Sequence, residues 1–190
     1  MMIAYTESQA AQNAVSFLRN ALTEASVNTE VLPVSKTVQG CIGCGKCWKK
    51  QRCVFEDEVN RAVDLIADSD AFLFVSDVHY GQPPKPFTDF LERLTHCVSD
   101  RMADKIAAFL PCGKKNAAEA YARIHPFFNG ANMIILSSKD ILTSDTDANE
   151  AVLRALSSRM IWLLSCMEKA RSEGLKAPEN TYQRKLDYIR

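Results

Sequence analysis

Short apolar runs alternate with longer amphipathic segments along most of this chain. The apolar runs have the length and composition of β-strands. They lie at Met2–Tyr5, Thr29–Val34, Asp70–Ser76, Lys105–Leu110 and Asn132–Ser137. The segments between them place apolar residues three or four positions apart, which is the spacing of a helix with one buried face. They lie at Ala11–Ala25, Glu58–Ser69, Phe87–Leu94, Asn116–Phe128 and Ala148–Ser172.

This alternation predicts an α/β fold in which a parallel sheet is covered by helices on both faces. The run Ala71–Val75 is apolar at every position, as expected for a strand at the centre of such a sheet. Thr6 and Gln9 have the spacing of a capping box for the first helix, and Gly174 is expected to end the last one.

The length and charge of the chain indicate its domain organisation and exclude some classes of partner. A chain of 190 residues has the usual size of one domain, expected over residues 1–175, with a cysteine-rich insertion at 40–54 and a polar tail at 176–190. The 23 basic side chains equal the 23 acidic ones in number, which argues against nucleic acid and anionic membranes as partners. The N-terminus lacks the features of a signal peptide or membrane span, so we expect a cytoplasmic protein.

The segment GCIGCGKCWKKQRC, residues 40–53, holds four of the seven cysteines. Cys41, Cys44, Cys47 and Cys53 follow the spacing C-x2-C-x2-C-x5-C. Thiolates at three-residue intervals converge on one compact inorganic core in ferredoxins, and structural disulfides are rare in a reducing compartment. The spacing therefore favours an iron-sulfur cluster, while a zinc site and free or redox-switching thiols remain open.

Other residues of the segment agree with a cluster. Gly43 and Gly45 give the backbone the freedom to wrap a ligand closely. Basic side chains would offset the negative charge of four thiolates; they are Lys46, Lys49, Lys50 and Arg52. Cys97, Cys112 and Cys166 stand alone in the sequence and are expected to be buried structural residues.

The order of elements, the motif CIGCGKCWKKQRCVFEDEV and the stretch DSDAFLFVSDVHYG together resemble the iron-sulfur flavoprotein and NAD(P)H-dependent FMN reductase group. The resemblance runs from about Met2 to Leu136. It implies a flavodoxin-like three-layer sandwich with strand order 2-1-3-4-5, and FMN at the carboxyl ends of the strands. It also implies a 4Fe-4S cluster, exchange of electrons with a small-molecule or protein partner, use of NAD(P)H, and a homodimer or homotetramer.

The resemblance also implies which residues bind FMN. The phosphate loop corresponds to residues 6–13, and the flavin-ring loops follow the third and fourth strands. The residues expected to contact FMN are Thr6, Ser8, Gln9, Asn13, Ser76, Val78, His79, Tyr80, Gly81, Cys112, Gly113 and Lys114. Tyr80 is a candidate for stacking on the flavin ring, with a simple capping role at the strand end as the alternative.

The phosphate loop departs from the family pattern. YTESQAAQNA lacks the arginine and the glycines of the family, and Glu7 adds negative charge where a phosphate would bind. In the second loop, Asp77 replaces the proline of the family and adds negative charge near the flavin ring. The third loop reads PCGKKN instead of a glycine-rich run. The sequence therefore predicts an FMN-dependent oxidoreductase with an iron-sulfur cluster. The alternative is a non-catalytic interaction or redox-sensing protein that has lost FMN and keeps a metal or thiol cluster.

Overall fold

The structure is a computed structural model, and it describes residues 1–113, 116–137, 142 and 146–177. Within these residues five strands form one parallel sheet. The strands are β1 (Met2–Thr6), β2 (Glu30–Val34), β3 (Ala71–Asp77), β4 (Ile106–Cys112) and β5 (Ile134–Ser137). Their order is β2-β1-β3-β4-β5, as expected for this fold class. The chain crosses from one half of the sheet to the other between β2 and β3.

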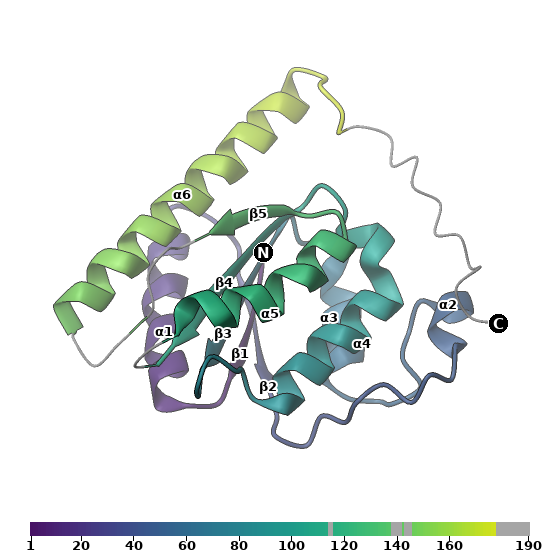
Figure 1. Cartoon of the computed structure of the whole chain (residues 1–190). Helices are drawn as coiled ribbons and strands as arrows, with labels where there is room; N and C mark the ends of the chain where they lie inside the picture. The colour runs from purple at the N-terminus through teal and green to yellow at the C-terminus, as the bar shows by residue number, and fades with distance from the viewer. Residues whose placement is uncertain (114–115, 138–141, 143–145, 178–190) are drawn as a thin grey trace.

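Six helices are described around this sheet (Figure 1). They are α1 (Gln9–Glu24), α2 (Lys46–Lys50), α3 (Glu58–Ile66), α4 (Lys85–Met102), α5 (Ala117–Gly130) and α6 (Thr146–Ser172). No described helix is both long and apolar enough to cross a bilayer. Gly174 follows α6 with φ +80°, in agreement with its expected role in ending that helix.

The strands alternate their side chains between two separate cores. Phe72 and Phe74 of β3 pack with α3, α4 and α5, and the Phe74 ring stacks on Phe128 with centroids 5.2 Å apart. Leu73 and Val75 point to the opposite face, which α1 and α6 cover. Figure 1 shows α6 lying beside α1 on that side. The sheet is therefore buried on both faces, as the uninterrupted apolar run predicted.

The main differences from the sequence prediction lie at element ends. β4 continues two residues beyond Leu110, because Pro111 and Cys112 still pair with Ser76 and Asp77 of β3. The five-residue helix α2 was not predicted. Helix α1 is capped by the Ser8 hydroxyl, which accepts a hydrogen bond from the Ala11 amide. The expected capping box with Thr6 is wrong, since Thr6 still belongs to β1.

Candidate metal centre and cofactor edge

The cysteine segment leaves β2, passes through α2 and returns to α3. Gly43 and Gly45 both have φ of +66°, a left-handed conformation that confirms the expected need for glycine. No residue of α2 is buried, and no side chain caps its N-terminus. The short helix is therefore held by its flanking loops rather than by its own packing.

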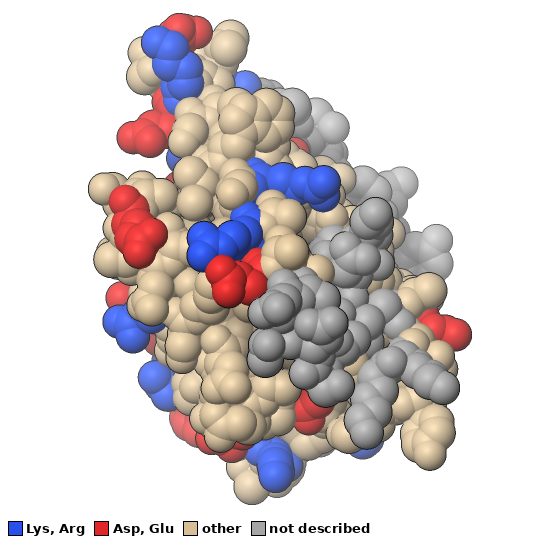
Figure 2. Space-filling model, turned by 90° about the vertical axis from the view of Figure 1, so that its left-hand side faces the viewer, with Lys and Arg blue, Asp and Glu red and all other residues tan. Residues whose placement is uncertain are grey.

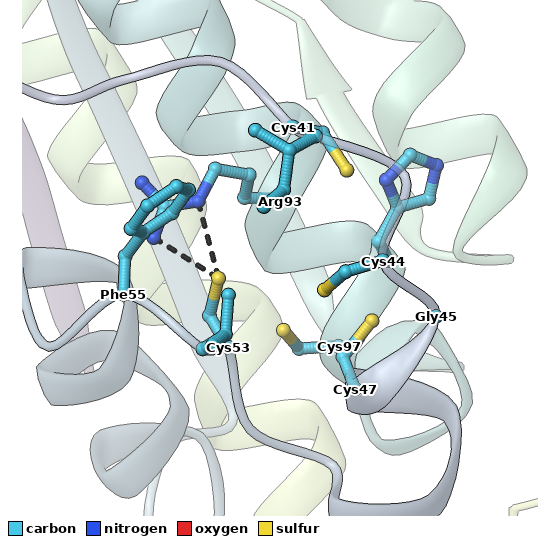
Figure 3. Close-up of a pocket in the computed structure, with 11 residues that line it drawn as sticks. Cys41, Cys44, Gly45, Cys47, Cys53, Phe55, Arg93 and Cys97 are labelled. Atoms are coloured by element: carbon cyan, nitrogen blue, oxygen red, sulfur yellow. Dashed lines mark hydrogen bonds between the residues drawn. The ribbon is translucent and has the colours of Figure 1, made fainter.

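The four motif cysteines line one pocket with an empty volume of about 330 Å³, part of it open to solvent (Figure 3). Residues of α4 form the wall behind them, namely Arg93, His96 and Cys97. In Figure 3 the labelled sulfurs point into a shared space rather than away from one another. The structure thus brings together all four cysteines that the motif singled out, and it adds a fifth thiol.

Arg93 is almost completely buried and binds the sulfur of Cys53. Its Nε and Nη2 atoms donate to the Cys53 Sγ over 3.3 and 3.1 Å. The same guanidinium donates to both carboxylate oxygens of Asp57 over 2.7 and 3.0 Å and to the Gln39 carbonyl over 3.1 Å. It also lies 4.8 Å from the centre of the Phe55 ring. A buried cation is therefore fixed against one predicted cluster ligand.

The backbone around Cys53 is fixed by a second buried side chain, Asn60. The Cys53 amide donates to the Asn60 Oδ1 over 2.8 Å, and the Asn60 Nδ2 donates to the carbonyls of Cys53 and Phe55 over 3.1 and 3.0 Å. Because Asn60 lies in the first turn of α3, this helix and α4 together set the position of Cys53.

The basic residues next to the motif behave differently from the expectation. Lys46, Lys49, Lys50 and Arg52 are all exposed. Arg52 pairs with Asp64 over 2.5 Å and with Glu56 over 3.9 Å, so its charge is directed toward α3. The cation that contacts a cysteine sulfur in this pocket is Arg93. Its role was missed because it lies 40 positions after Cys53 in the sequence.

Two thiols of the pocket, those of Cys47 and Cys97, share a hydrogen bond. Burial raises the pKa of Cys47. Burial, and then the nearby Cys47 and Cys53 sulfurs, raise the pKa of Cys97 to about 12. A reactive or redox-switching cysteine needs a lowered pKa, so these two thiols do not suit that role without a metal.

The expectation for the three isolated cysteines is correct only in part. Cys97 is buried but lines the pocket instead of standing alone, and Cys166 is exposed, so its predicted burial is wrong. Cys112 is buried at the end of β4, as expected. The spacing of Arg93, His96 and Cys97 at i, i+3 and i+4 places them on one helix face. That spacing was the signal in the sequence that these three residues share a helix face, but it did not show that this face meets the cysteine segment.

The predicted phosphate loop begins where β1 ends. The Thr6 hydroxyl donates to the Asp77 carboxylate, and the Asp77 amide donates to the Thr6 oxygen over 3.1 Å. The Ser8 hydroxyl accepts from the Ala11 amide over 3.3 Å, and the Gln9 amide group donates to Asn13 over 2.9 Å. The polar side chains predicted to hold a phosphate are therefore bonded to one another and to the start of α1.

The predicted flavin-ring loop follows β3. The Ser76 hydroxyl donates to the Asp77 carbonyl over 2.9 Å, and the Val78 amide donates to the Cys112 carbonyl over 2.8 Å. His79 pairs with Gln82 through two backbone hydrogen bonds of 3.0 Å. Tyr80 is 95% exposed with φ +51°, so its ring stands out from the surface and is accessible to a ligand.

Gly81 is required by its surroundings. Its φ is +74°, and a β-carbon at this position would lie 2.7 Å from the Glu119 Cβ. The loop after β3 therefore packs closely on the first turn of α5, and this contact fixes the backbone next to Tyr80.

The third predicted loop is only partly described. Burial, and then the neighbouring Asp77 carboxylate, raise the pKa of the Cys112 thiol to about 12. The Gly113 amide donates to the Leu142 carbonyl over 2.8 Å. Lys114 lies outside the described residues. The described part of this loop thus offers a buried neutral thiol and a backbone amide that is already bonded.

At the β1 edge, a phosphate dianion would meet carboxylates and hydroxyl groups that are already bonded to protein atoms. The Thr6 hydroxyl is bonded to Asp77, the Ser8 oxygen caps α1, and no Lys or Arg occurs between Thr6 and Asn13. Two carboxylates, Glu7 and Asp77, flank the place where a phosphate would approach the N-terminus of α1. The cysteine pocket, in contrast, has the donor set of a thiolate-ligated centre together with a fixed cation.

A family model described as NADPH-dependent FMN reductase matches residues 6–147 of this chain. Among curated proteins, an iron-sulfur flavoprotein from Archaeoglobus fulgidus is 33% identical over 60 residues, which are 32% of this chain and 27% of that protein. The matched stretch therefore spans about a quarter of the relative's length.

Solved structures resemble this chain in fold. A flavodoxin, WrbA-like protein from Agrobacterium tumefaciens superposes with a TM-score of 0.58 at 12% identity, covering 85% of this chain and 94% of that one. An NAD(P)H:quinone oxidoreductase from Methanothermobacter marburgensis gives a TM-score of 0.59 at 13% identity, covering 83% and 92%. With the strand order, these likenesses show a flavodoxin-like fold.

Proposed function

The chain belongs to the NADPH-dependent FMN reductase family, and on that premise we propose that it is an oxidoreductase that transfers electrons through a 4Fe-4S cluster. The proposed ligands are Cys41, Cys44, Cys47 and Cys53. The observation that carries the proposal is the convergence of these four side chains on one pocket, with Arg93 donating to the Cys53 sulfur. When bound, such a cluster supplies reversible one-electron transfer.

The spacing of the ligand atoms supports a cluster over a single zinc ion. Four thiolates around one tetrahedral zinc lie about 3.8 Å apart, as follows from a Zn–S distance of about 2.3 Å. Among the described residues, a group of three or more candidate ligand atoms within 4.8 Å of one another is found only at Cys41, Glu92 and His96. The four motif sulfurs are thus spread more widely than one zinc ion requires, as ligands around a multi-atom core would be.

The chain's own residues would control such a centre in two ways. Arg93 would hold the Cys53 sulfur in place and offset its negative charge, because hydrogen bonds to ligand sulfurs help set a cluster's potential. Asn60 would hold the Cys53 backbone. Val54 and Phe55 add apolar surface to the pocket and would limit the access of water.

Helix α4 connects the pocket to the predicted flavin edge. It begins at Lys85, just after the loop that carries Tyr80, and Arg93 follows eight residues later. Eight residues of a helix span about 12 Å. We propose FMN as the second cofactor on the basis of the family, with NAD(P)H as its source of electrons. The exposed Tyr80 would cover one face of the flavin ring.

A second candidate function is favoured by the hydrogen bonds between Thr6 and Asp77. They occupy the side chain expected to receive the phosphate and leave a carboxylate beside it. In this alternative, the chain keeps the metal centre, has lost FMN, and serves as an interaction or redox-sensing protein.

Anaerobic purification tests the cluster. The expected sample is brown and contains iron and acid-labile sulfide, and both are lost when Cys41, Cys44, Cys47 and Cys53 are all replaced by Ser. Cys166→Ser is the matched control, because Cys166 is exposed and lies outside the pocket. A colourless wild-type protein without iron would refute the proposal.

Titration with FMN separates the two candidates. If the protein is the proposed oxidoreductase, it quenches the fluorescence of FMN, and the quenching reaches a plateau as FMN binding saturates. If the alternative is correct, the fluorescence of FMN does not change. If the protein contains iron but does not quench the fluorescence of FMN, the cluster assignment stands and the second candidate function is the correct one.

A further inference from the structure

Three potential metal ligands from two separate segments meet at one end of the cysteine pocket. The ligand atoms of Cys41, Glu92 and His96 all lie within 4.8 Å of one another. Glu92 and His96 belong to α4, whereas Cys41 precedes α2. Glu92 and His96 have no place in the proposed cluster, so the group needs an explanation of its own.

The three ligands are positioned by helix α4 and by the loop before α2. Glu92 and His96 are four residues apart in α4, so their side chains lie on the same face of one helix. The Gly43 amide donates to the Cys41 sulfur over 3.4 Å, which orients that sulfur. Gly43 reaches this position through its left-handed backbone. Helix α4 and the loop before α2 thus bring their ligand atoms to the same place.

The donor set defines the class of ion. One thiolate, one imidazole and one carboxylate suit a borderline-soft divalent ion such as Zn²⁺, while Mg²⁺ and Ca²⁺ prefer oxygen ligands only. Ligand atoms around a tetrahedral zinc at about 2.0–2.3 Å lie roughly 3.3–3.8 Å apart. The present separations of at most 4.8 Å need only small side-chain rotations to reach that geometry.

We propose that Cys41, Glu92 and His96 form a mononuclear site for Zn²⁺ or a similar divalent ion. The three protein ligands leave the fourth position of a tetrahedron for water, as in catalytic zinc sites. Cys41 is exposed, and Glu92 and His96 are half-buried, so an ion reaches the site from solvent. Because Cys41 is also a proposed cluster ligand, the ion and the cluster exclude each other. Zinc therefore occupies chains that lack the cluster.

Cobalt titration of a cluster-free variant tests this site. The background variant carries Cys44→Ser, Cys47→Ser and Cys53→Ser, which removes three proposed cluster ligands and keeps Cys41, Glu92 and His96. Adding Co²⁺ alone is expected to give one bound ion per chain, with near-ultraviolet absorption from a sulfur-to-cobalt charge transfer. Zn²⁺ is expected to displace Co²⁺ and remove this absorption.

Single substitutions in that background identify the ligands. Cys41→Ser is expected to abolish the charge-transfer absorption, and Glu92→Gln and His96→Ala are each expected to weaken Co²⁺ binding at least about tenfold. Glu24→Gln and Glu168→Gln are the matched controls, since both residues are exposed and lie outside the pocket. His96→Gln replaces His96→Ala if the smaller side chain prevents folding.

The proposal is overturned if Co²⁺ does not bind, if the absorption survives Cys41→Ser, or if Glu92→Gln and His96→Ala bind as tightly as the controls. Its failure is distinct from that of the cluster assignment, which depends on the iron content of the wild-type protein. His96→Ala in the wild-type chain is expected to retain iron and sulfide in full. Loss of iron there would instead make His96 a cluster ligand and refute a separate site.

Discussion

At the scale of single residues, Arg93 both pairs with a carboxylate and donates to a proposed cluster ligand. Its guanidinium neutralises Asp57 and donates to the Cys53 sulfur, with a side chain that is only 1% exposed. A buried cation is tolerated only when its donors are paired, and here the carboxylate, the sulfur and the Gln39 carbonyl supply that pairing. Arg93 therefore links the core of the domain to the proposed redox centre.

Arg93→Met is expected to lower the midpoint potential of the cluster by tens of millivolts. A positive donor to a thiolate ligand stabilises the reduced, more negative centre, and a tenfold shift in a one-electron equilibrium corresponds to about 59 mV. A redox titration of the anaerobic protein, followed by visible absorption, measures this change. Arg61→Met is the control, because Arg61 is exposed on α3. An unchanged or higher potential in Arg93→Met would contradict the assigned role.

Asp77→Asn is expected to strengthen FMN binding by about tenfold or more. The substitution removes a negative charge beside the proposed phosphate position, and repulsion between two charges at close range near a surface amounts to about 1–4 kcal/mol. Fluorescence titration with FMN gives the affinity. Riboflavin is the matched control ligand because it lacks the phosphate, and an equal gain for riboflavin would rule out the electrostatic explanation.

The sequence identified some of these site residues and gave no sign of the others. The motif spacing identified Cys41, Cys44, Cys47 and Cys53, because ligands within one segment must converge locally. The contribution of Arg93 was not predictable from a single sequence, since it depends on how α4 packs against the loop. The bond from Thr6 to Asp77 was hidden for the same reason, as these residues meet only when β1 and β3 pair.

At the scale of elements, α2 is the least self-sufficient helix among those described. It has five residues, none of them buried, and isolated helices of this length are unstable in water. Its N-cap residue Gly45 and its C-cap residue Gln51 are both left-handed. The helix is thus a local turn of the ligand loop, which explains why no amphipathic pattern predicted it.

Removal of the metal centre is expected to loosen residues 40–54 and to leave the sheet intact. The segment has few buried contacts of its own, whereas β3 and β4 are buried along nearly their whole length. Hydrogen–deuterium exchange of the holo-protein and the chelator-treated protein compares the two regions directly. We expect exchange to rise in α2 and its flanking loops alone, and equal protection before and after chelation would count against a structural role for the metal.

The loop between β3 and α4 depends on one glycine. Gly81→Ala is expected to lower the free energy of unfolding by about 1–3 kcal/mol, because the residue has φ +74° and the new methyl group would overlap Glu119. Gly130→Ala is the matched control. Beyond the neighbouring residues and the backbone of its own helix, no atom lies within 4 Å of where a β-carbon would stand, and alanine favours a helix by up to about 1 kcal/mol. Urea denaturation measures both variants, and equal stabilities would show that the loop accommodates the side chain.

At the scale of the whole molecule, the strand–helix alternation was enough to predict the order of elements and the burial of both sheet faces. The physical reason is that the spacing of apolar residues within a short segment determines whether that segment forms a helix or a strand. In β3 every position from Ala71 to Val75 is apolar, so successive side chains enter the two cores in turn. The relation of the ligand loop to α4 depends on long-range packing and lay beyond a single sequence. Helix α4 is what joins the pocket to the strand ends, since its first turn follows the Tyr80 loop and its middle lines the pocket.

An ion pair between residues 101 positions apart connects the C-terminal end of α6 to the start of β3. Arg171 donates to Asp70, just before β3, over 2.7 Å, and both side chains are about half exposed. The hydrogen bond from Arg171 is the main reason that the pKa of Asp70 is lowered. The folded chain therefore releases the Asp70 proton more readily than the unfolded chain does.

Arg171→Ala is expected to destabilise the protein at pH 7 by less than about 1 kcal/mol, since exposed ion pairs contribute little. Because the folded pKa of Asp70 lies below the unfolded value, the stabilisation is complete above the unfolded pKa of about 3.9 and disappears as the pH falls through the folded pKa. Urea denaturation from pH 7 down to pH 2.5 is expected to show the difference between wild type and variant closing at the acidic end. A difference that persists unchanged at low pH would mean that Arg171 stabilises α6 through packing of its carbon chain rather than through its charge.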